Sequence, residues 1–342
     1  MAAPIFYESN EALVYRFIND YKLPIQYFDP LNFDSQLELF EADYQSFTKW
    51  SNMVDEIRNR FHGDAEAFLN AYYRDRDKII TNTLINPAFE EFNNGYMDAY
   101  FIKDKPKIPK ANIYKEENDG KTFISIDMKQ ANFHALRKVN PDIVFKADTY
   151  EEFLEKGANI RSPYIKGSKY FREVVFGQLN PSRHITVEKY YTVMMLKNII
   201  SSKEVQNLCP LTEDNAVFLS NDEIIFSITK PLAPDTWEDL RNAILACSID
   251  GFEFRVEWFK LEGYSLWTDD DYKERKKVTD GYVKIPLDHI GGEKLCAVPL
   301  SFFNLFYKGV YGIPYNADDR LVKYDKVLTA RFEHNFIVRK GF

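Results

Sequence analysis

The sequence predicts an α+β fold, and three observations lead to this expectation. Apolar side chains recur at three-to-four spacing through much of the first hundred residues, which is typical of helices. From residue 122 onward, short runs of β-forming residues alternate with helical segments. Glycine- and proline-rich turns separate these segments, as expected when strands and helices share one domain.

The N-terminal part of the chain is expected to be mostly helical. Its periodic segments cover residues 35–60 and about 63–80. A Lys- and Pro-rich segment at 103–121 has turn residues and no periodicity, which indicates a loop or linker. The sequence therefore predicts a helical region at 1–102, followed by a linker at 103–121.

The region 122–268 is expected to hold strands and helices in alternation. Its first strand, TFISID at 122–127, is an apolar run that ends at an aspartate. The elements expected after it are a helix at 130–139, a helix at 149–158 capped by Thr149, a helix at 168–177, two strands around a tight turn at 215–230, a helix at 233–248 and strands at 252–268. A C-terminal extension at 269–342 is expected to be rich in strands and loops, with turn signals at DGY, HIGGE, GIPYNADD and RKGF.

Composition restricts the class of protein. Hydrophobic residues make up 45% and charged residues 28% of the 342 residues, which is ordinary for a globular chain. The net charge of −8 argues against a nucleic-acid-binding protein unless the charge is segregated, with carboxylates at one site and lysines along a groove. The 28 Phe and 22 Tyr are first of all core material, although such rings also stack on bases.

Several classes of site and location are disfavoured. Cys209, Cys247 and Cys296 are far apart in the sequence, so neither a disulfide framework nor a structural zinc site is expected and a reducing compartment fits best. No apolar run reaches 18 residues, and the first residues lack the pattern of a signal peptide. We therefore expect a cytoplasmic protein without membrane contact. No P-loop, GxGxxG after a strand or GxSxG elbow is present.

Two acidic positions stand out. Asp127 ends an apolar strand, and Asp222 and Glu223 lie at the apex of the expected hairpin VFLSNDEIIFSI. Two-metal phosphoryl transfer needs carboxylates that hold two divalent ions about 3.5–4 Å apart, and Mg²⁺ prefers such hard oxygen ligands. Taken singly, a strand-end Asp is more often a helix cap, and an Asp-Glu turn is usually a solvated hairpin tip.

The order of four motifs resembles the palm of family A DNA polymerases. ISIDMKQANFHALR is similar to the family's motif A, with Asp127 and Gln130 in register. REVVFGQLN is similar to motif B, with Arg172 four positions before Phe176, and FLSNDEIIFSI is similar to motif C around Asp222 and Glu223. RVEWFKLEGYSLW at 255–267 looks like the strand that ends the family's palm. The resemblance covers roughly residues 120–270.

The resemblance implies a nucleotidyltransferase that extends a nucleic-acid 3′ hydroxyl with (d)NTPs on a primer or template. Asp127 and Asp222 would hold two Mg²⁺ or Mn²⁺ ions, and Glu223 would complete the catalytic set. The implied nucleotide-binding residues are Lys169, Arg172, Gln130, Asn132 and Phe176. The N-terminal helices would be thumb-like, and the 103–121 segment is either a solvated connector or a strand that contacts primer or template.

The sequence also departs from the family. Arg172 stands at the motif B lysine, and arginine binds phosphate well but resists losing its proton. Asn180, Asn132 and Asn221 stand at the motif B Tyr, the sugar-screening motif A Glu and the motif C His. Only 50 positions separate Arg172 from Asp222, so the fingers are expected to be reduced.

Three functional alternatives remain open on the sequence. The first is a compact polymerase of viral or mobile-element origin, which would act in the host cytoplasm if viral. The second is a template-independent or otherwise specialised terminal transferase, which the reduced fingers favour. The third is a non-catalytic degenerate palm that binds nucleic acid or serves in assembly. The acidic net charge and the lost motif residues favour the third, whereas retention of Asp127, Asp222 and Glu223 together argues against it, because clustered carboxylates are costly without a metal.

Overall fold

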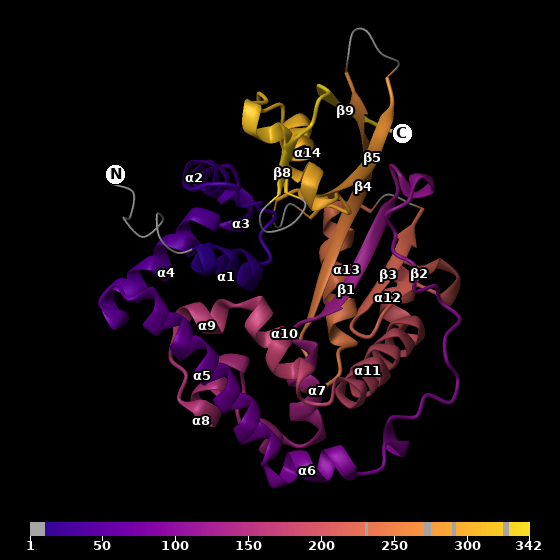
Figure 1. Cartoon of the computed structure of the whole chain (residues 1–342). Coiled ribbons are helices and arrows are strands. Elements are labelled where there is room, and N and C mark those ends of the chain that lie inside the picture. Colours follow the sequence, from indigo (N-terminus) through magenta and orange to yellow (C-terminus); the bar gives the residue numbers. More distant parts are fainter. Residues whose placement is uncertain (1–10, 230–231, 270–274, 289–291, 324–327) are drawn as a thin grey trace. The chain divides into compact units, whose positions relative to one another are not determined.

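The computed structural model describes residues 11–229, 232–269, 275–288, 292–323 and 328–342. It is a mixed α+β structure (Figure 1), which confirms the expected fold class at this level. The helices are α1 (Glu11–Tyr21), α2 (Pro30–Leu39), α3 (Glu41–Tyr44), α4 (Ser46–Phe61), α5 (Ala65–Leu84), α6 (Pro87–Asn94), α7 (Ala131–Val139), α8 (Tyr150–Ala158), α9 (Pro163–Gly167), α10 (Lys169–Gly177), α11 (Pro181–Ser201), α12 (Lys203–Leu208), α13 (Pro234–Ala246) and α14 (Phe303–Tyr311).

The strands are β1 (Thr122–Met128), β2 (Ala216–Leu219), β3 (Glu223–Ile228), β4 (Phe254–Thr268), β5 (Lys277–Pro286), β6 (Lys294–Cys296), β7 (Leu321–Lys323), β8 (Thr329–Arg331) and β9 (Phe336–Lys340). Within the described ranges, no helix is long and apolar enough to cross a membrane.

The chain divides into two compact units. Unit 1 comprises the described residues of 1–65, 114–121 and 259–342, and unit 2 comprises 66–113 and 122–258. This division runs through β4, whose residues up to Trp258 belong to unit 2. The boundaries expected from the sequence, 1–102, 103–121, 122–268 and 269–342, followed composition along the chain, whereas the structure groups segments that are far apart in sequence.

Unit 2 is built on antiparallel strands. Their order is β2, β3, β1 and then the beginning of β4, and the β1–β3 register pairs Thr122 with Ile228 and Asp127 with Glu223. The interior residues of β1 are buried, because both faces of this strand are covered. Helix α11 packs against α7 and β3. The strand pairing and this helix fix the ends of β1 and β3, where the acidic residues lie.

Unit 1 combines the remainder of β4 with segments from both chain ends. Strand β4 pairs with β5 and β9, β5 pairs with β6, and β7 and β8 form a separate two-stranded sheet. Aromatic side chains join the first helices to α14: the ring centroids of Phe40 and Tyr307 lie 5.0 Å apart, and the Tyr307 hydroxyl donates a hydrogen bond to Asp43 at 2.8 Å. Many of the abundant aromatic residues are therefore core material, as expected.

Most elements expected in unit 2 are confirmed. Strand β1, helices α7, α8, α10 and α13 and the β2–β3 hairpin all lie where the sequence predicts them. Thr149 caps α8 by accepting a hydrogen bond from the backbone N–H of Glu152 at 3.2 Å. The 21-residue helix α11 was not expected, because its many β-branched and aromatic residues favour strands locally.

The C-terminal region differs from expectation in two places. The DGY signal at 280–282 is not a turn: Gly281 pairs with Tyr264 inside β5. A Cβ atom at Gly281 would approach Val298 and Phe306 to within 2.5 and 2.8 Å, so glycine is needed here for close packing rather than for turning. The helix α14 was also not expected. The HIGGE signal includes residues 289–291, which lie outside the described residues.

Candidate active site

The acidic residues come together through the β1–β3 pairing in unit 2. Asp127 is directly opposite Glu223 in the antiparallel register, and the backbone N–H of Met128 donates a hydrogen bond to the carbonyl of Asp222 at 2.8 Å. Directly opposite residues on antiparallel strands have Cβ atoms about 4.5–5.5 Å apart. Carboxylates that are almost a hundred positions apart in the sequence are thus neighbours in the fold.

Hydroxyl groups hold the hairpin tip and its carboxylates. The Ser220 hydroxyl donates to Asp222 Oδ1 at 2.9 Å and accepts from the backbone N–H of Glu223 at 2.9 Å. The buried Ser125 hydroxyl donates to Glu223 Oε1 at 2.6 Å. From α11, the Thr192 hydroxyl donates to the backbone carbonyl of Asn221 at 2.7 Å. These bonds restrict the rotamers of both acidic side chains before any ligand binds.

An open cleft of about 550 Å³ begins at Asp127, and we call it the charged cleft. Four of the residues singled out from the sequence line it: Asp127, Gln130, Lys169 and Arg172. Its other lining residues are mostly charged: Lys129, His134, Asp148, Thr149, Glu151, Glu253 and Arg255. Asp222 and Glu223 adjoin Asp127 through the strand pairing but are not part of the lining.

Arg255 is the cation that contacts Asp127. Its Nη2 lies 3.0 Å from Asp127 Oδ2, and its Nε lies 3.6 Å from Glu257 Oε1. The side chains of Asp127 and Arg255 are 28% and 49% exposed, so water screens this pair and its energy is modest. Arg255 thereby offsets part of the repulsion between the neighbouring acidic side chains.

Helix α10 presents two cations to the charged cleft. Lys169 and Arg172 are three positions apart and therefore lie on one face of this helix, whose N-terminus is capped by the Ser168 side chain. The Arg172 guanidinium lies 5.7 Å from the centroid of the Tyr150 ring. Among the described residues, Lys169 has no ion-pair partner. A helix N-terminus with two such cations is suited to bind phosphate.

Gln130 shapes the entrance from β1 into α7. It adopts a left-handed backbone conformation with φ of 46°, which is uncommon for a residue other than glycine. This conformation reverses the chain within the two residues between the strand and the helix. Strained backbone conformations of this kind are often found at functional sites, and Gln130 lines the cleft together with Asp127.

Asn132 and Phe176 lie away from the lining of the charged cleft. The Asn132 amide donates to Glu188 Oε1 at 2.7 Å, and His184 Nδ1 lies 2.9 Å from the same oxygen. His184 Nε2 in turn lies 3.1 Å from the backbone carbonyl oxygen of Phe176, whose ring is buried. This buried polar network joins α7, α10 and α11, so both residues are held by the packing of these helices.

Seven of the lining residues were not predicted as site residues from the sequence, and two of them, Arg255 and His134, bear on the chemistry of the cleft. Arg255 lies 128 positions after Asp127, and its motif gave no indication of their contact. His134 was not among the predicted site residues, yet it lines the cleft. Burial lowers the pKa of His134, and the nearby charge of Arg137 lowers it further, against an opposing effect of Glu253. The imidazole is therefore neutral at pH 7 and is able to accept a proton.

The carboxylate oxygens of this site are suited to bind Mg²⁺ when substrate phosphates supply further ligands. Within the described ranges, no group of three or more His, Cys, Asp or Glu side chains is placed to hold a metal ion. Asp127, Asp222 and Glu223 nevertheless supply hard oxygen donors on adjacent strand ends. Magnesium in nucleotide-processing sites is commonly held by one or two carboxylates together with substrate phosphates and water.

All three cysteines are free thiols.

Comparison of the chain with models of known protein families, with curated proteins and with solved structures found no match.

Proposed function

We propose that this chain is a nucleotidyltransferase that extends the 3′ hydroxyl of a nucleic acid with (d)NTPs, using a palm similar to that of family A DNA polymerases. The observation that carries the proposal is the pairing of β1 with β3, which puts Asp127 opposite Glu223 and next to Asp222. The four motifs follow one another in the family's order, and three of them meet around one strand pair and one cleft.

Asp127 and Asp222 would hold two Mg²⁺ or Mn²⁺ ions. When bound, these ions supply the charge that lowers the pKa of the attacking hydroxyl and stabilises the leaving oxygen. Glu223, fixed by Ser125, adds negative charge at the edge of the site. Arg255 keeps Asp127 oriented toward the cleft until a stronger cation replaces it.

Lys169 and Arg172 would bind the triphosphate of the incoming nucleotide. Both line the charged cleft that begins at Asp127, so a nucleotide held there would have its phosphates near the carboxylates. The guanidinium of Arg172 offers a planar fork of donors for phosphate oxygens but does not serve as a proton donor at neutral pH. Its packing over Tyr150 fixes the plane of that fork.

The proposed nucleotide site also includes Gln130, Asn132 and Phe176, of which only Gln130 lines the charged cleft. Gln130 would contact the sugar or base directly. Asn132 and Phe176 would act through their bonds to α11, because both belong to the buried network around His184. Because Asn132 is shorter than the family's glutamate and does not line the cleft, it should not exclude ribonucleotides.

The test is primer extension with each dNTP and NTP, with and without template, in Mg²⁺ and in Mn²⁺. We expect metal-dependent addition of nucleotides to the 3′ end. Addition that follows the template identifies a polymerase, whereas addition without template identifies a terminal transferase. If no nucleotide is added under any of these conditions, the proposed activity is wrong and a non-catalytic binding role takes its place.

Asp222→Asn distinguishes this chemistry from a contaminating activity. The amide keeps the shape of the side chain but cannot bring the carboxylate charge to a metal ion, so incorporation should fall at least tenfold. Asp214→Asn is the matched control, because Asp214 is an exposed residue just before β2 in the same unit. Equal activity of both variants and of the wild type would exclude Asp222 from the site.

A further inference from the structure

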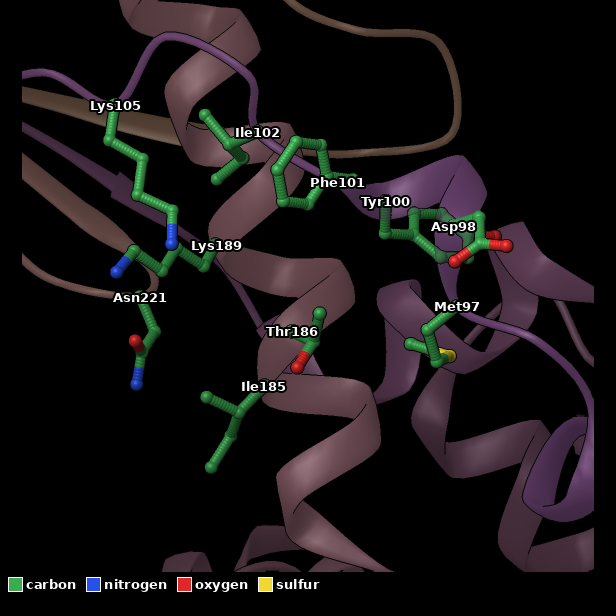
Figure 2. A pocket seen from close by; sticks show the side chains of 10 residues that line it. All are labelled: Met97, Asp98, Tyr100, Phe101, Ile102, Lys105, Ile185, Thr186, Lys189 and Asn221. Atoms are coloured by element: carbon green, nitrogen blue, oxygen red, sulfur yellow. The ribbon is translucent and has the colours of Figure 1, made fainter.

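A second cleft in unit 2 is lined in part by Asn221 of the hairpin tip, and we call it the aromatic–lysine cleft. Its volume is about 510 Å³. Figure 2 shows its lining, which includes Phe101, Ile102 and Ile185 on its apolar walls, and Lys105, Lys189 and Asn221 at one end. Asn221 immediately precedes Asp222, so this cleft begins one residue from the proposed active site.

The lysines of this cleft are gathered without anionic partners. Lys105 and Lys189 lie beside Asn221 at one end of the cleft, and Asp98 lies at the other end (Figure 2). Neither of them, nor Lys110, forms an ion pair with any residue that the structure describes. Burial lowers the pKa of Lys189, and the like charges of Lys110 and Lys105 lower it further. An anion bound between these ammonium groups would relieve their mutual repulsion.

Aromatic rings are exposed at and near the same cleft. Phe101 is 69% exposed and lines the cleft, and the nearby Tyr96 is 95% exposed. Single exposed aromatic side chains are common on protein surfaces. Here, however, the ring of Phe101 lies at the start of an extended segment that carries several exposed lysines: Lys103, Lys105, Lys107 and Lys110. An exposed ring followed by several exposed lysines along one segment is what distinguishes this surface.

The extended segment is held in place by the sheet and by α11. The carbonyl of Pro109 accepts a hydrogen bond from the backbone N–H of Leu219 in β2 at 3.1 Å. Tyr100 packs edge-on against Tyr190 of α11, with ring centroids 5.6 Å apart. The cleft is therefore formed by fixed backbone on both sides rather than by a freely moving linker.

We propose that the aromatic–lysine cleft binds a single-stranded nucleic acid, with a base against Phe101 and a phosphate between Lys105 and Lys189. Stacking on an exposed ring and neutralisation of phosphate by unpaired lysines are the two interactions by which proteins hold single strands without sequence preference. A protein with a net charge of −8 would not attract a polyanion over its whole surface, so a local cluster of cations is required. The placement beside Asp222 indicates that the bound strand leads toward the charged cleft; this part rests on the proposed function.

The test is binding of a fluorescein-labelled single strand of about twelve nucleotides, within the range of known site sizes. Fluorescence anisotropy is measured in EDTA, so that neither metal nor nucleotide transfer contributes. The double variant Lys105→Gln/Lys189→Gln should bind about tenfold more weakly, and the slope of log affinity against log salt should fall by about 0.7, the value for one lost phosphate contact on a single strand. Phe101→Ala should weaken binding at least about fivefold through loss of stacking.

Two matched controls separate the cleft from general surface effects. Lys203→Gln removes an exposed lysine on α12, and Tyr73→Ala removes an exposed ring on α5, both in unit 2 and outside the cleft. Both controls should retain the affinity of the wild type. Affinities of the cleft variants within twofold of the wild type, or an equal loss in the controls, would overturn the inference.

The cleft and the proposed activity fail separately. If the cleft variants lose affinity but the wild type adds no nucleotide in any metal, the binding site stands and the proposed transfer reaction is wrong. If nucleotides are added and the cleft variants retain both strand affinity and product yield, the reaction stands and the assignment of this cleft is wrong.

Discussion

Asp127→Asn should abolish nucleotide incorporation while leaving the fold almost unchanged, and the contacts of Asp127 give the size of both effects. The substitution removes the ion pair between Asp127 and Arg255. Solvent-exposed ion pairs contribute about 0–1 kcal/mol to stability. It also removes the repulsion between Asp127 and Glu223, which costs about 0.2–1 kcal/mol for like charges directly opposite on antiparallel strands. Because these changes have opposite signs, the free energy of unfolding should change by less than about 1 kcal/mol.

The catalytic effect of the same substitution should be much larger. Loss of a carboxylate that holds a metal removes several kcal/mol of transition-state stabilisation, and about 3 kcal/mol corresponds to more than a hundredfold in rate. Thermal unfolding followed by circular dichroism without metal should show a midpoint within about 2–4 °C of the wild type. Added Mn²⁺ should raise the midpoint of the wild type but not that of the variant, because only the wild type binds it in the folded state.

Asp250→Asn is the matched control for Asp127→Asn. Asp250 is an exposed aspartate of unit 2 that pairs with Lys138 at 3.7 Å and does not line the charged cleft. It should keep full incorporation and the metal-induced rise in midpoint. The two-metal assignment is refuted if Asp127→Asn keeps more than about a tenth of the wild-type rate, or if its midpoint rises with Mn²⁺ as that of the wild type does.

Three further predictions concern two residues that line the charged cleft, Arg172 and His134, and the buried Tyr150 that packs against Arg172. Arg172→Ala should raise the KM for nucleotide and Arg172→Lys should partly restore it, because a point charge replaces attraction but not the fork; steady-state kinetics with equal KM values in all three proteins would remove Arg172 from the site. Tyr150→Phe should raise the free energy of unfolding by up to about 1–3 kcal/mol, because the buried Tyr150 hydroxyl has no hydrogen-bond partner among the described residues; a lower denaturation midpoint would contradict this. Stability should fall as the pH drops below about 6.5, the ordinary pKa of histidine, because the unfolded state binds a proton more readily than the buried His134 imidazole does. The denaturation midpoints at pH 5 and pH 7.5 should therefore differ less in His134→Gln than in the wild type.

Sugar choice gives a last prediction at Asn132. Measurable ribonucleotide incorporation is expected, because Asn132 is shorter than the glutamate of the resembled family and does not line the charged cleft, so it cannot block the 2′ hydroxyl. Single-nucleotide incorporation with dATP against ATP on matched primers measures it. A preference for dATP above about ten-thousandfold would show that another group excludes the 2′ hydroxyl.

Local signals in the sequence were sufficient for much of unit 2. The apolar run that ends at Asp127 predicts β1, and Thr149 with Glu152 predicts the start of α8, because both depend on residues within a few positions. Helix α11 could not be predicted in this way, since its Val, Ile, Thr and Tyr residues favour strands until packing against α7 and β3 overrides them.

The candidate site was predictable to the extent that its motifs are local. Asp127, Lys169 and Arg172 were identified by motif, and the structure brings them to one cleft. The contact between Arg255 and Asp127 depends on the pairing of β4 with β1, and the bond between Asn132 and Glu188 depends on the packing of α7 against α11. Such contacts are set by tertiary structure and leave no periodic signal along the chain.

Strands β1 and β3 pair in the sheet but lie far apart in the sequence, and this has a consequence for folding. Their pairing closes a loop of about a hundred residues, so we expect it to form after local helices such as α7 and α8 during folding. A partly folded chain, or a fragment that ends before β3, would have these helices but would not bring Asp222 and Glu223 to Asp127. The proposed incorporation activity would therefore require the complete tertiary structure, whereas the helix content measured by circular dichroism would not.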